Sequence, residues 1–264
     1  MIENCTNTAT VNGTGSRKTA YTYEGIIEKE LNATRTGGIV GYAEKTKINY
    51  VTNTGKIECL NTTYPIGGLG GIIGELRNGD ITNSYNDGEV KGVSVLGSGG
   101  ILGAGNYQLN INNCYNKKPI TGRENVGGIA GGAVQANISY CYNTQTITTS
   151  SKKGGGIVGW QAPFNSADYT DNSMWYCYNI GSVTGDVTGT ILGSINYYSL
   201  DYTYGLIGTS PNMVGTYQNY KGDGSHYGLL NKQGLISIIL STYGSNFKAD
   251  TSNINDGYPI LSWQ

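Results

Sequence analysis

The sequence predicts an all-β protein, a right-handed parallel β-solenoid (β-helix) of about six coils with a C-terminal cap that contains a short helix. Three observations lead to this prediction: a glycine-rich run recurs six times, a second short pattern alternates with it, and the period stays near 28 residues. Such a period, holding short β-branched segments, is typical of stacked coils. Right-handedness is expected from the usual hand of parallel crossovers.

The first pattern is an apolar run enclosed by glycines, Gly-Gly-Ile-x-Gly in its best copies. Successive copies begin 33, 29, 28, 28 and 34 residues apart, and the sixth copy is weaker. The glycines suit tight corners and a close approach between neighbouring coils. The copies are Gly37–Gly41, Gly70–Gly74, Gly99–Gly103, Gly127–Gly131, Gly155–Gly159 and Gly189–Gly193.

The second pattern is an apolar residue, two variable residues and then Cys-Tyr-Asn. Four of the five cysteines share its first fixed position, and small residues replace cysteine in two copies, which favours an inward ladder of free thiols. A disulfide or metal framework is the alternative in a secreted protein. The position is filled by Cys5, Val51, Ser84, Cys114, Cys141 and Cys177, whereas Cys59 lies elsewhere.

The asparagine that closes the second pattern recurs in six copies and predicts a ladder of hydrogen-bonded amides. The tyrosine before it should point away from the core if the cysteine points inward. Stacking between coils is the structural interpretation of these tyrosines. A strip that binds sugar rings or a partner is the functional one. The asparagines are Asn7, Asn53, Asn86, Asn116, Asn143 and Asn179, and the tyrosines are Tyr85, Tyr115, Tyr142 and Tyr178.

Composition restricts the function classes. Charged residues make up 13% of the chain and the net charge is -1, which argues against a nucleic-acid binder with its basic stripe. No apolar run reaches the roughly 18 residues of a membrane helix, so membrane insertion is not expected. The single histidine, His226, excludes multi-histidine zinc sites, and we expect neither a metal nor a cofactor.

Departures from the period predict where loops emerge. The first coil inserts residues 14–36 and a later coil inserts residues 161–173. Residues 194–264 leave the pattern, so we divide the chain into a solenoid over 1–193 and a C-terminal capping segment over 194–264. Within that segment, residues 229–243 predict a short helix that stops at Gly244, and residues 254–261 predict a turn followed by a strand. The segment would cover an open sheet edge.

The insertion at residues 161–173 and the residues beside it carry a cluster of acidic and aromatic side chains. Sugar rings stack on Trp and Tyr while their hydroxyls bind carboxylates, so a glycan is the expected ligand if the loop binds one. Paired carboxylates could also serve a polysaccharide-degrading β-helix. A solvated loop is the structural alternative. The candidate residues are Trp160, Asp168, Tyr169, Asp171 and Trp175, with Lys152 and Lys153 one coil earlier.

The alternation of Gly-Gly-Ile-Val-Gly with Cys-Tyr-Asn-x-Gly resembles the GLUG repeats of bacterial cell-surface and adhesin-like proteins. The resemblance covers residues 2–193 and extends to the ending at 256–263. It implies a secreted or wall-attached protein, a class that includes non-catalytic parts of IgA-cleaving metallopeptidases. The metal motif of those peptidases, His-Glu-x-x-His, is absent from this sequence, so peptidase activity is not carried over.

These observations predict a non-enzymatic repeat module of a secreted or cell-surface bacterial protein, acting as an adhesin-like stalk or interaction surface. No catalytic residues are assigned. A host or cell-surface glycan or protein is the expected partner, and we expect the chain to be part of a longer polypeptide. The alternative is a carbohydrate-binding or carbohydrate-active β-helix that uses the loop at 160–176.

Overall fold

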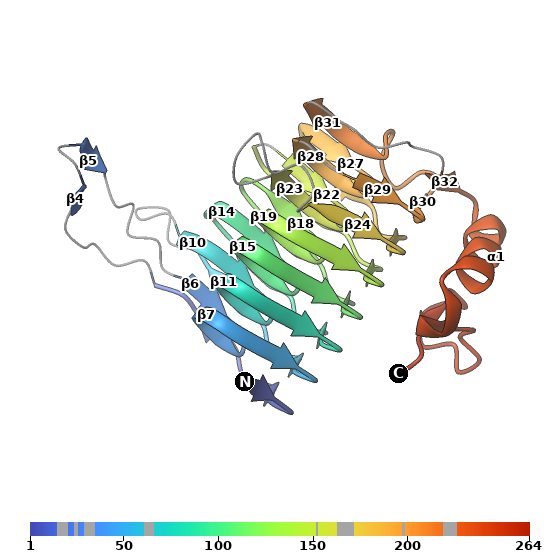
Figure 1. Ribbon diagram of the computed structural model, residues 1–264, viewed down its shortest axis with the longest axis horizontal. Coiled ribbons are helices and arrows are strands. Elements are labelled where there is room, and N and C mark those ends of the chain that lie inside the picture. Colours follow the sequence, from blue (N-terminus) through green and yellow to red (C-terminus); the bar gives the residue numbers. More distant parts are fainter. Residues whose placement is uncertain are drawn as a thin grey trace.

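The computed structural model describes residues 1–14, 21–23, 26–28, 35–60, 66–151, 153–162, 172–196, 199–218 and 226–264. Within these residues the chain is a parallel β-solenoid with one short helix near its C-terminus, which confirms the predicted fold class (Figure 1). Five turns are complete, and each supplies strands to four parallel sheets. The predicted handedness stays a prediction.

Each complete turn has strands in four sheets, because the chain bends at short corners between them. The predicted count of about six coils is slightly too high. The coil that begins at the sixth glycine run adds β27, β28 and β30 to three sheets, but among the described residues it adds no strand to the fourth.

The first sheet, called here the long sheet, holds the longest strands and is parallel throughout. Its order is β1-β7-β11-β15-β19-β23-β28-β31, and β24 and β29 extend it beyond a break. The strands are β1 (Ile2–Glu3), β7 (Val40–Asn49), β11 (Ile73–Thr82), β15 (Leu102–Asn112), β19 (Ala130–Ser139), β23 (Val158–Ala162), β24 (Ser173–Trp175), β28 (Leu192–Asn196), β29 (Ser199–Asp201) and β31 (Val214–Gln218).

The second sheet, the glycine sheet, precedes the long sheet in each turn and leads into the glycine run. Close approach explains its composition: a Cβ on Gly70 would lie 2.0 Å from the Ile73 carbonyl oxygen. Its strands are β6 (Arg35–Gly37), β10 (Ile66–Gly70), β14 (Ser94–Gly99), β18 (Val126–Gly127), β22 (Lys153–Gly155) and β27 (Val187–Gly189).

The third sheet, the tyrosine sheet, contains the second sequence pattern, and the fourth, the aliphatic sheet, closes each turn. The tyrosine sheet comprises β2 (Thr6–Asn7), β8 (Thr52–Asn53), β12 (Tyr85–Asn86), β16 (Tyr115–Asn116), β20 (Tyr142–Asn143), β25 (Tyr178–Asn179), β30 (Thr203–Leu206) and β32 (Tyr227–Leu230). The aliphatic sheet comprises β3 (Val11–Asn12), β9 (Ile57–Cys59), β13 (Val90–Gly92), β17 (Ile120–Gly122), β21 (Ile147–Thr149) and β26 (Val183–Thr184).

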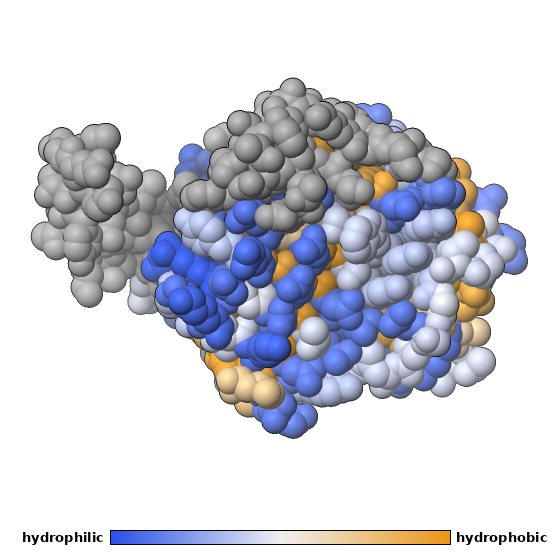
Figure 2. Space-filling model, viewed as in Figure 1, coloured by the Kyte–Doolittle hydropathy of each residue, from blue (hydrophilic) through white to orange (hydrophobic). Residues whose placement is uncertain are grey.

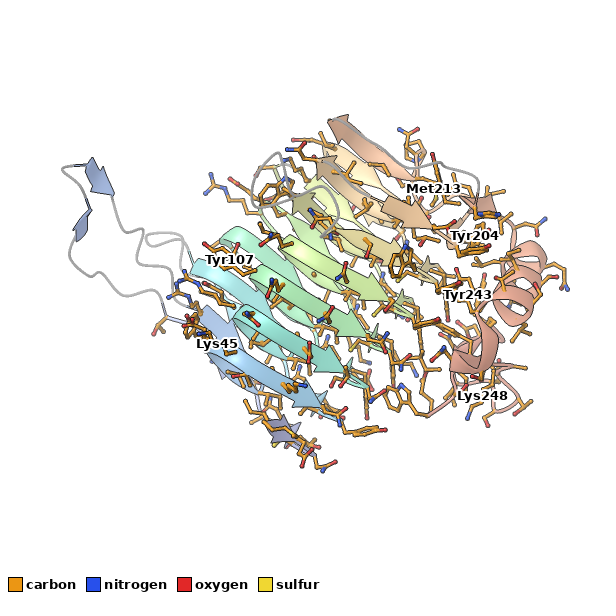
Figure 3. The ribbon with its side chains drawn as sticks, viewed as in Figure 1. Lys45, Tyr107, Tyr204, Met213, Tyr243 and Lys248 are labelled. Carbon is orange, nitrogen blue, oxygen red and sulfur yellow. The ribbon has the colours of Figure 1, made fainter. Side chains whose placement is uncertain are left out.

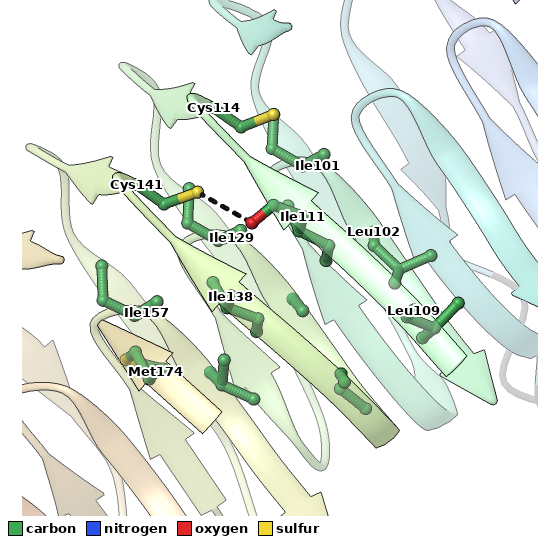
Figure 4. Packing of buried hydrophobic residues seen from close by; sticks show 14 of the residues in the cluster. Ile101, Leu102, Leu109, Ile111, Cys114, Ile129, Ile138, Cys141, Ile157 and Met174 are labelled. Atoms are coloured by element: carbon green, nitrogen blue, oxygen red, sulfur yellow. Dashed lines mark hydrogen bonds between the residues drawn. The ribbon is translucent and has the colours of Figure 1, made fainter. Parts of the chain in front are cut away.

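The interior is filled by columns of like residues, one from each turn. Isoleucine faces isoleucine along the long sheet, where Ile81 pairs in register with Ile48 and Ile111. The cysteines of the second pattern lie beside them, and the Cys141 thiol donates to the Ile111 carbonyl 3.7 Å away (Figure 4). Cys114, Cys141 and Cys177 are fully buried free thiols, which confirms the predicted inward column for these turns, whereas Cys5 in the first copy is exposed.

The asparagine ladder is continuous. Each side-chain Nδ2 donates to the Oδ1 of the asparagine in the next turn, over five steps of 2.7–2.8 Å from Asn7 to Asn179. The second glycine of each run lies against this ladder: a Cβ on Gly100 would lie 2.7 Å from the Asn116 side chain. The two sequence patterns therefore pack on each other, which explains why they alternate.

The last part of the C-terminal segment begins with helix α1 (Lys232–Thr242), which follows β32. Asn231 caps its first turn by accepting from the Gly234 amide at 2.9 Å, and Gly244 follows it with a φ of 63°. The helix thus starts three residues later than predicted, since the two leucines before the cap belong to β32. A short 3-10 turn (Gly244–Asn246) leads to the antiparallel pair β33 (Phe247–Lys248) and β34 (Ile260–Leu261).

Parallel pairing extends past residue 193, because β28, β30, β31 and β32 all add to solenoid sheets. The division into domains at 193/194 stays a prediction. The segment from α1 onward lies along the flank of the tyrosine sheet, where Figure 1 shows the helix and the C-terminus beside the strand ends. At the N-terminal end, β4 (Tyr21–Tyr23) and β5 (Ile26–Glu28) form the antiparallel pair of the first insertion.

Candidate functional site

Only two of the five predicted binding residues lie in the described part of the chain. Trp160 is in β23 and Trp175 is in β24, on either side of the inserted loop. Asp168, Tyr169 and Asp171 lie outside the described residues, as does Lys152. The acid–aromatic cluster of the loop therefore stays a prediction.

The structure does not bring the two tryptophans together. Both strands pair with β19, but Trp160 is opposite Gly132 and Trp175 is opposite Ser139. Seven residues of extended strand separate those partners, which corresponds to about 23 Å. One sugar ring cannot contact both indoles, so each belongs to its own part of the surface.

Trp160 forms one wall of a small hollow on the outer face of the long sheet. Small residues stand at its register position in the two preceding turns, Gly132 and Ala104. The hollow has a volume of about 50 Å³. The ammonium of Lys153 lies 5.5 Å from the centre of the indole ring, a cation–π contact that holds the ring in place.

The break in the long sheet between β23 and β24 is filled by two buried amides. Asn172 Oδ1 accepts from the Ala136 amide at 3.0 Å, and Gln161 Nε2 donates to the Ala136 carbonyl at 2.8 Å. At the break, these two side chains take the place of the main-chain groups that a continuous neighbouring strand would offer to β19. These two residues near the ends of the insertion therefore satisfy the main-chain groups of Ala136 at the break.

Three turns nearer the N-terminus than Trp160, the same outer register position holds a charged cluster that the sequence interpretation missed. Glu75 is 1% exposed, and its carboxylate accepts from the guanidinium Nε of both Arg35 and Arg77, the latter at 3.0 Å. Both guanidinium groups also lie over the ring of Tyr42, at 5.1 and 5.9 Å from its centre. Because Arg35 and Arg77 are both positively charged and Glu75 carries a single negative charge, the cluster has a net positive charge.

The electrostatics of Arg77 keep it charged. Burial acts to lower its pKa, but the neighbouring Glu75 carboxylate acts in the opposite direction, and the net pKa is raised. Within the described residues, Arg77 makes one hydrogen bond, through Nε. Its other guanidinium hydrogens are therefore available for a ligand.

Beside this cluster lies a recess that is larger than the hollow at Trp160, called here the arginine groove, with a volume of about 370 Å³. It crosses four neighbouring strands of the long sheet, and Figure 3 shows Lys45 and Tyr107 at the same end of that sheet. Hydrophilic atoms gather at this end of the molecule in Figure 2. Its lining is Glu44, Lys45, Arg77, Asn78, Tyr107, Gln108 and Gln135.

The tyrosine column of the second pattern is stacked, and it is also covered. Neighbouring rings from Tyr85 to Tyr178 lie 4.8–5.0 Å apart and within 4° of parallel. The C-terminal segment packs on them: the Tyr178 hydroxyl donates to the Pro259 carbonyl, and the Tyr142 hydroxyl lies 2.8 Å from Gln264 Oε1. This surface is occupied by the chain itself, so the stacking interpretation is confirmed there.

The buried thiols are poor candidates for chemistry. Burial raises the pKa of both Cys114 and Cys141, so they stay protonated and unreactive near neutral pH. Among the described residues, no group of three or more His, Cys, Asp or Glu side chains could hold a metal ion. The described part of the chain also contains no helix that is long and apolar enough to cross a membrane.

Part of the chain matches a sequence motif that is known from other proteins. Residues 122–148, which span one turn from the end of β17 into β21, match the model of the GLUG motif. The chain carries a GLUG repeat. No relative with a curated description matches the chain in sequence.

One solved structure shares the fold of this GLUG-repeat chain. It is a crystal structure from Bacteroides ovatus of a protein assigned by name alone as an immunoglobulin A1 protease. The two superimpose with a TM-score of 0.52 and 21% sequence identity, over 84% of this chain and 75% of that chain. At this identity the likeness shows a shared fold.

Proposed function

We propose that the chain is a non-enzymatic repeat module of a secreted or cell-surface bacterial protein, acting as an adhesin-like stalk or interaction surface. The GLUG motif supports the proposed secreted or cell-surface location, since GLUG repeats occur in extracellular bacterial proteins. A host or cell-surface glycan or protein is the proposed partner.

The observation that carries the proposal is the continuity of the interior ladders. The asparagine amides bond from turn to turn over five steps, and apolar columns fill the space beside them. Stacked coils of this kind form a quasi-one-dimensional rod whose stability is a sum over neighbouring turns. The outer residue that follows the glycine run differs from turn to turn, so recognition is expected on the outer faces.

A second candidate function is carbohydrate binding or cleavage at the loop of residues 160–176. The observation in its favour is the partly exposed indole of Trp160 beside a hollow. Catalysis would need two carboxylates flanking the sugar bond. The acids that could serve there, Asp168 and Asp171, belong to the inserted loop, outside the described residues.

The test separates binding from turnover. The purified chain is incubated with a panel of polysaccharides and with immunoglobulin A1, and bound and released material are measured over time. The proposal predicts saturable binding to at least one surface or glycan, with neither new reducing ends nor new peptide fragments. Product that increases with time and with protein amount would overturn it.

A double variant addresses the second candidate. If a glycan binds at the loop, Trp160→Ala combined with Trp175→Ala abolishes binding while the fold, monitored by circular dichroism, is retained. Binding that is unchanged in this variant rejects the loop as the site.

A further inference from the structure

We propose that the arginine groove binds an acidic saccharide, a sugar chain whose rings carry carboxylates. This deepens the proposed function, on which it rests, by naming a site and a ligand class. The site is distinct from the loop at 160–176. It lies on β7, β11, β15 and β19, nearer the N-terminus than β23.

The size and direction of the groove fit a short sugar chain. Its volume of about 370 Å³ lies in the range of small-molecule sites. It crosses four strands, a span of about 14 Å at the normal strand spacing of about 4.8 Å. One strand spacing is close to the length of one sugar residue, so successive rings would meet successive turns of the solenoid.

The charged residues select an anion. Arg77 and Lys45 line the groove against one acid, Glu44, and the nearby carboxylate of Glu75 is already shared by two guanidinium groups. A carboxylate on the ligand would accept hydrogen bonds from the unused guanidinium hydrogens of Arg77. Such charge-assisted bonds are the stronger kind, and the planar guanidinium favours a planar carboxylate.

The guanidinium is held in place before any ligand arrives. The buried carboxylate of Glu75 fixes Nε of Arg77, and the ring of Tyr42 lies 5.9 Å from the guanidinium carbon. Fixing the side chain in this way removes much of the entropy loss that a free arginine would suffer on binding. The anion site is therefore preorganised.

The remaining lining residues suit a sugar ring better than a peptide. Tyr107 is 41% exposed and offers a ring face, while Asn78 and Gln108 bring amides that can donate to and accept from hydroxyls. Aromatic faces stack on the C–H faces of sugars, and amides read their hydroxyl groups. An acidic peptide would use the cations but few of these other groups.

The experiment is calorimetric titration of the full chain with a tetrasaccharide of galacturonate and with the same tetrasaccharide as its methyl ester. The pair shares the same sugar backbone, and only the carboxyl groups differ, being anionic in the acid and neutral and methylated in the ester. We expect the acid to bind about tenfold more tightly or better, because a hydrogen bond to a charged group is worth about that factor. Equal affinity for acid and ester would overturn the proposal, as would preferential binding of a tetra-aspartate peptide.

Variants locate the site. Arg77→Gln should reduce the affinity for the acid to that for the ester. The matched control is Arg123→Gln, because the Arg123 side chain is 53% exposed against 44% for Arg77 and is also near an acid, Glu124 at 3.9 Å, but lies outside the groove. Unchanged acid binding in Arg77→Gln, or equal loss in both variants, would contradict the proposed location.

Tyr107→Asn tests the aromatic ring of the groove and leaves Arg35, Arg77 and Glu75 unsubstituted. Asparagine tolerates the left-handed backbone at this position, where φ is 65°, so the variant removes the ring and keeps the turn. We expect acid and ester both to bind about tenfold more weakly, and unchanged affinity would overturn the assignment.

Release of shorter sugars in these samples would overturn the non-enzymatic proposal alone, whereas equal acid and ester binding would overturn this inference alone.

Discussion

The flank of the tyrosine sheet and the outer face of the long sheet are both built from columns that contribute one side chain per turn. On the flank, one residue type repeats, the rings stack at 4.8–5.0 Å, and the C-terminal segment covers them. On the long sheet, the outer register position differs in every turn and its hollows stay open. A uniform column serves stability, and a varied column creates recesses that can recognise a ligand.

The largest expected difference between the two surfaces appears at alkaline pH. Burial raises the pKa of Tyr142, Tyr178 and Tyr243 well above the usual value, whereas in the unfolded chain tyrosine ionises near pH 10. Above about pH 10 the unfolded state therefore loses protons that the folded state keeps. Stability should be fully present below pH 10 and fall by at most about 1.4 kcal/mol per pH unit for each buried tyrosine.

Urea unfolding between pH 8 and pH 11.5, with tyrosinate absorbance recorded in parallel, measures this effect. We expect the buried tyrosines to ionise only as the protein unfolds. Reversible ionisation of all 22 tyrosines near pH 10 with no loss of structure would contradict the covered flank.

A substitution gives the next largest effect. Tyr178→Ala removes a fully buried ring and its hydrogen bonds to Asn255 and to the Pro259 carbonyl. Large-to-small changes in a core destabilise a protein by about 3–5 kcal/mol. Tyr107→Ala is the control on the open face, with the same chemical change at a 41% exposed side chain and an expected loss below about 1 kcal/mol. Similar urea midpoints for the two variants would remove the distinction between the surfaces.

Asn143→Ala compares a buried ladder asparagine with an exposed asparagine on the long sheet, Asn110. It leaves a neighbouring ladder amide and the Gln145 carbonyl without their partners, which should destabilise the fold by about 1–3 kcal/mol. Asn110→Ala removes an exposed amide that bonds Asp80 at 2.9 Å, and should change stability by at most about 0.5 kcal/mol. If urea unfolding gives the same midpoint for Asn143→Ala and wild type, the ladder does not stabilise the stack.

The smallest effect is expected at the outer tryptophan. Trp160→Ala removes an indole that is only partly buried and rests against Lys153, so its thermal midpoint should fall by a few degrees or less. A loss comparable to that of Tyr178→Ala would show that Trp160 packs as a structural lid.

The sequence predicted the features that depend on repetition. The period predicted stacked coils, and the shared positions of Cys114, Cys141 and Cys177 predicted an inward thiol column, because an in-register stack places equal positions above one another. The alternation of glycine runs with asparagines is explained by the contact between Gly100 and Asn116. Each of these inferences needed only the spacing of like residues.

The arginine groove and the charged cluster beside it could not be predicted from repetition, because their residues differ from turn to turn. The residue directly after each glycine run is Tyr42, Glu75, Ala104, Gly132, Trp160 or Ser194, and the structure aligns all six in one outer column. A comparison of the varying positions, as well as the constant ones, would have placed Trp160 and Glu75 on the same face. Arg35 would still have been missed, since it comes from the glycine sheet.

The covered flank depends on a contact between distant parts of the chain. The sequence predicted a helix and a strand in the C-terminal segment, and both exist, but nothing in their spacing shows that Pro259 would meet Tyr178. The outward direction of the tyrosines was predicted correctly from strand alternation. Whether solvent or protein covers them is decided by tertiary packing, which the local pattern does not encode.

Hydroxyl-radical footprinting of the folded chain, read by mass spectrometry, tests the contrast between the two surfaces most directly. Oxidation of tyrosine reports solvent access to the ring, and the two surfaces offer matched residues. Tyr42 and Tyr107 are 42% and 41% exposed, whereas Tyr142 and Tyr178 are 0% exposed. The account predicts rapid oxidation of the first pair and protection of the second until the protein unfolds. Equal oxidation rates for the two pairs in the folded protein would contradict it.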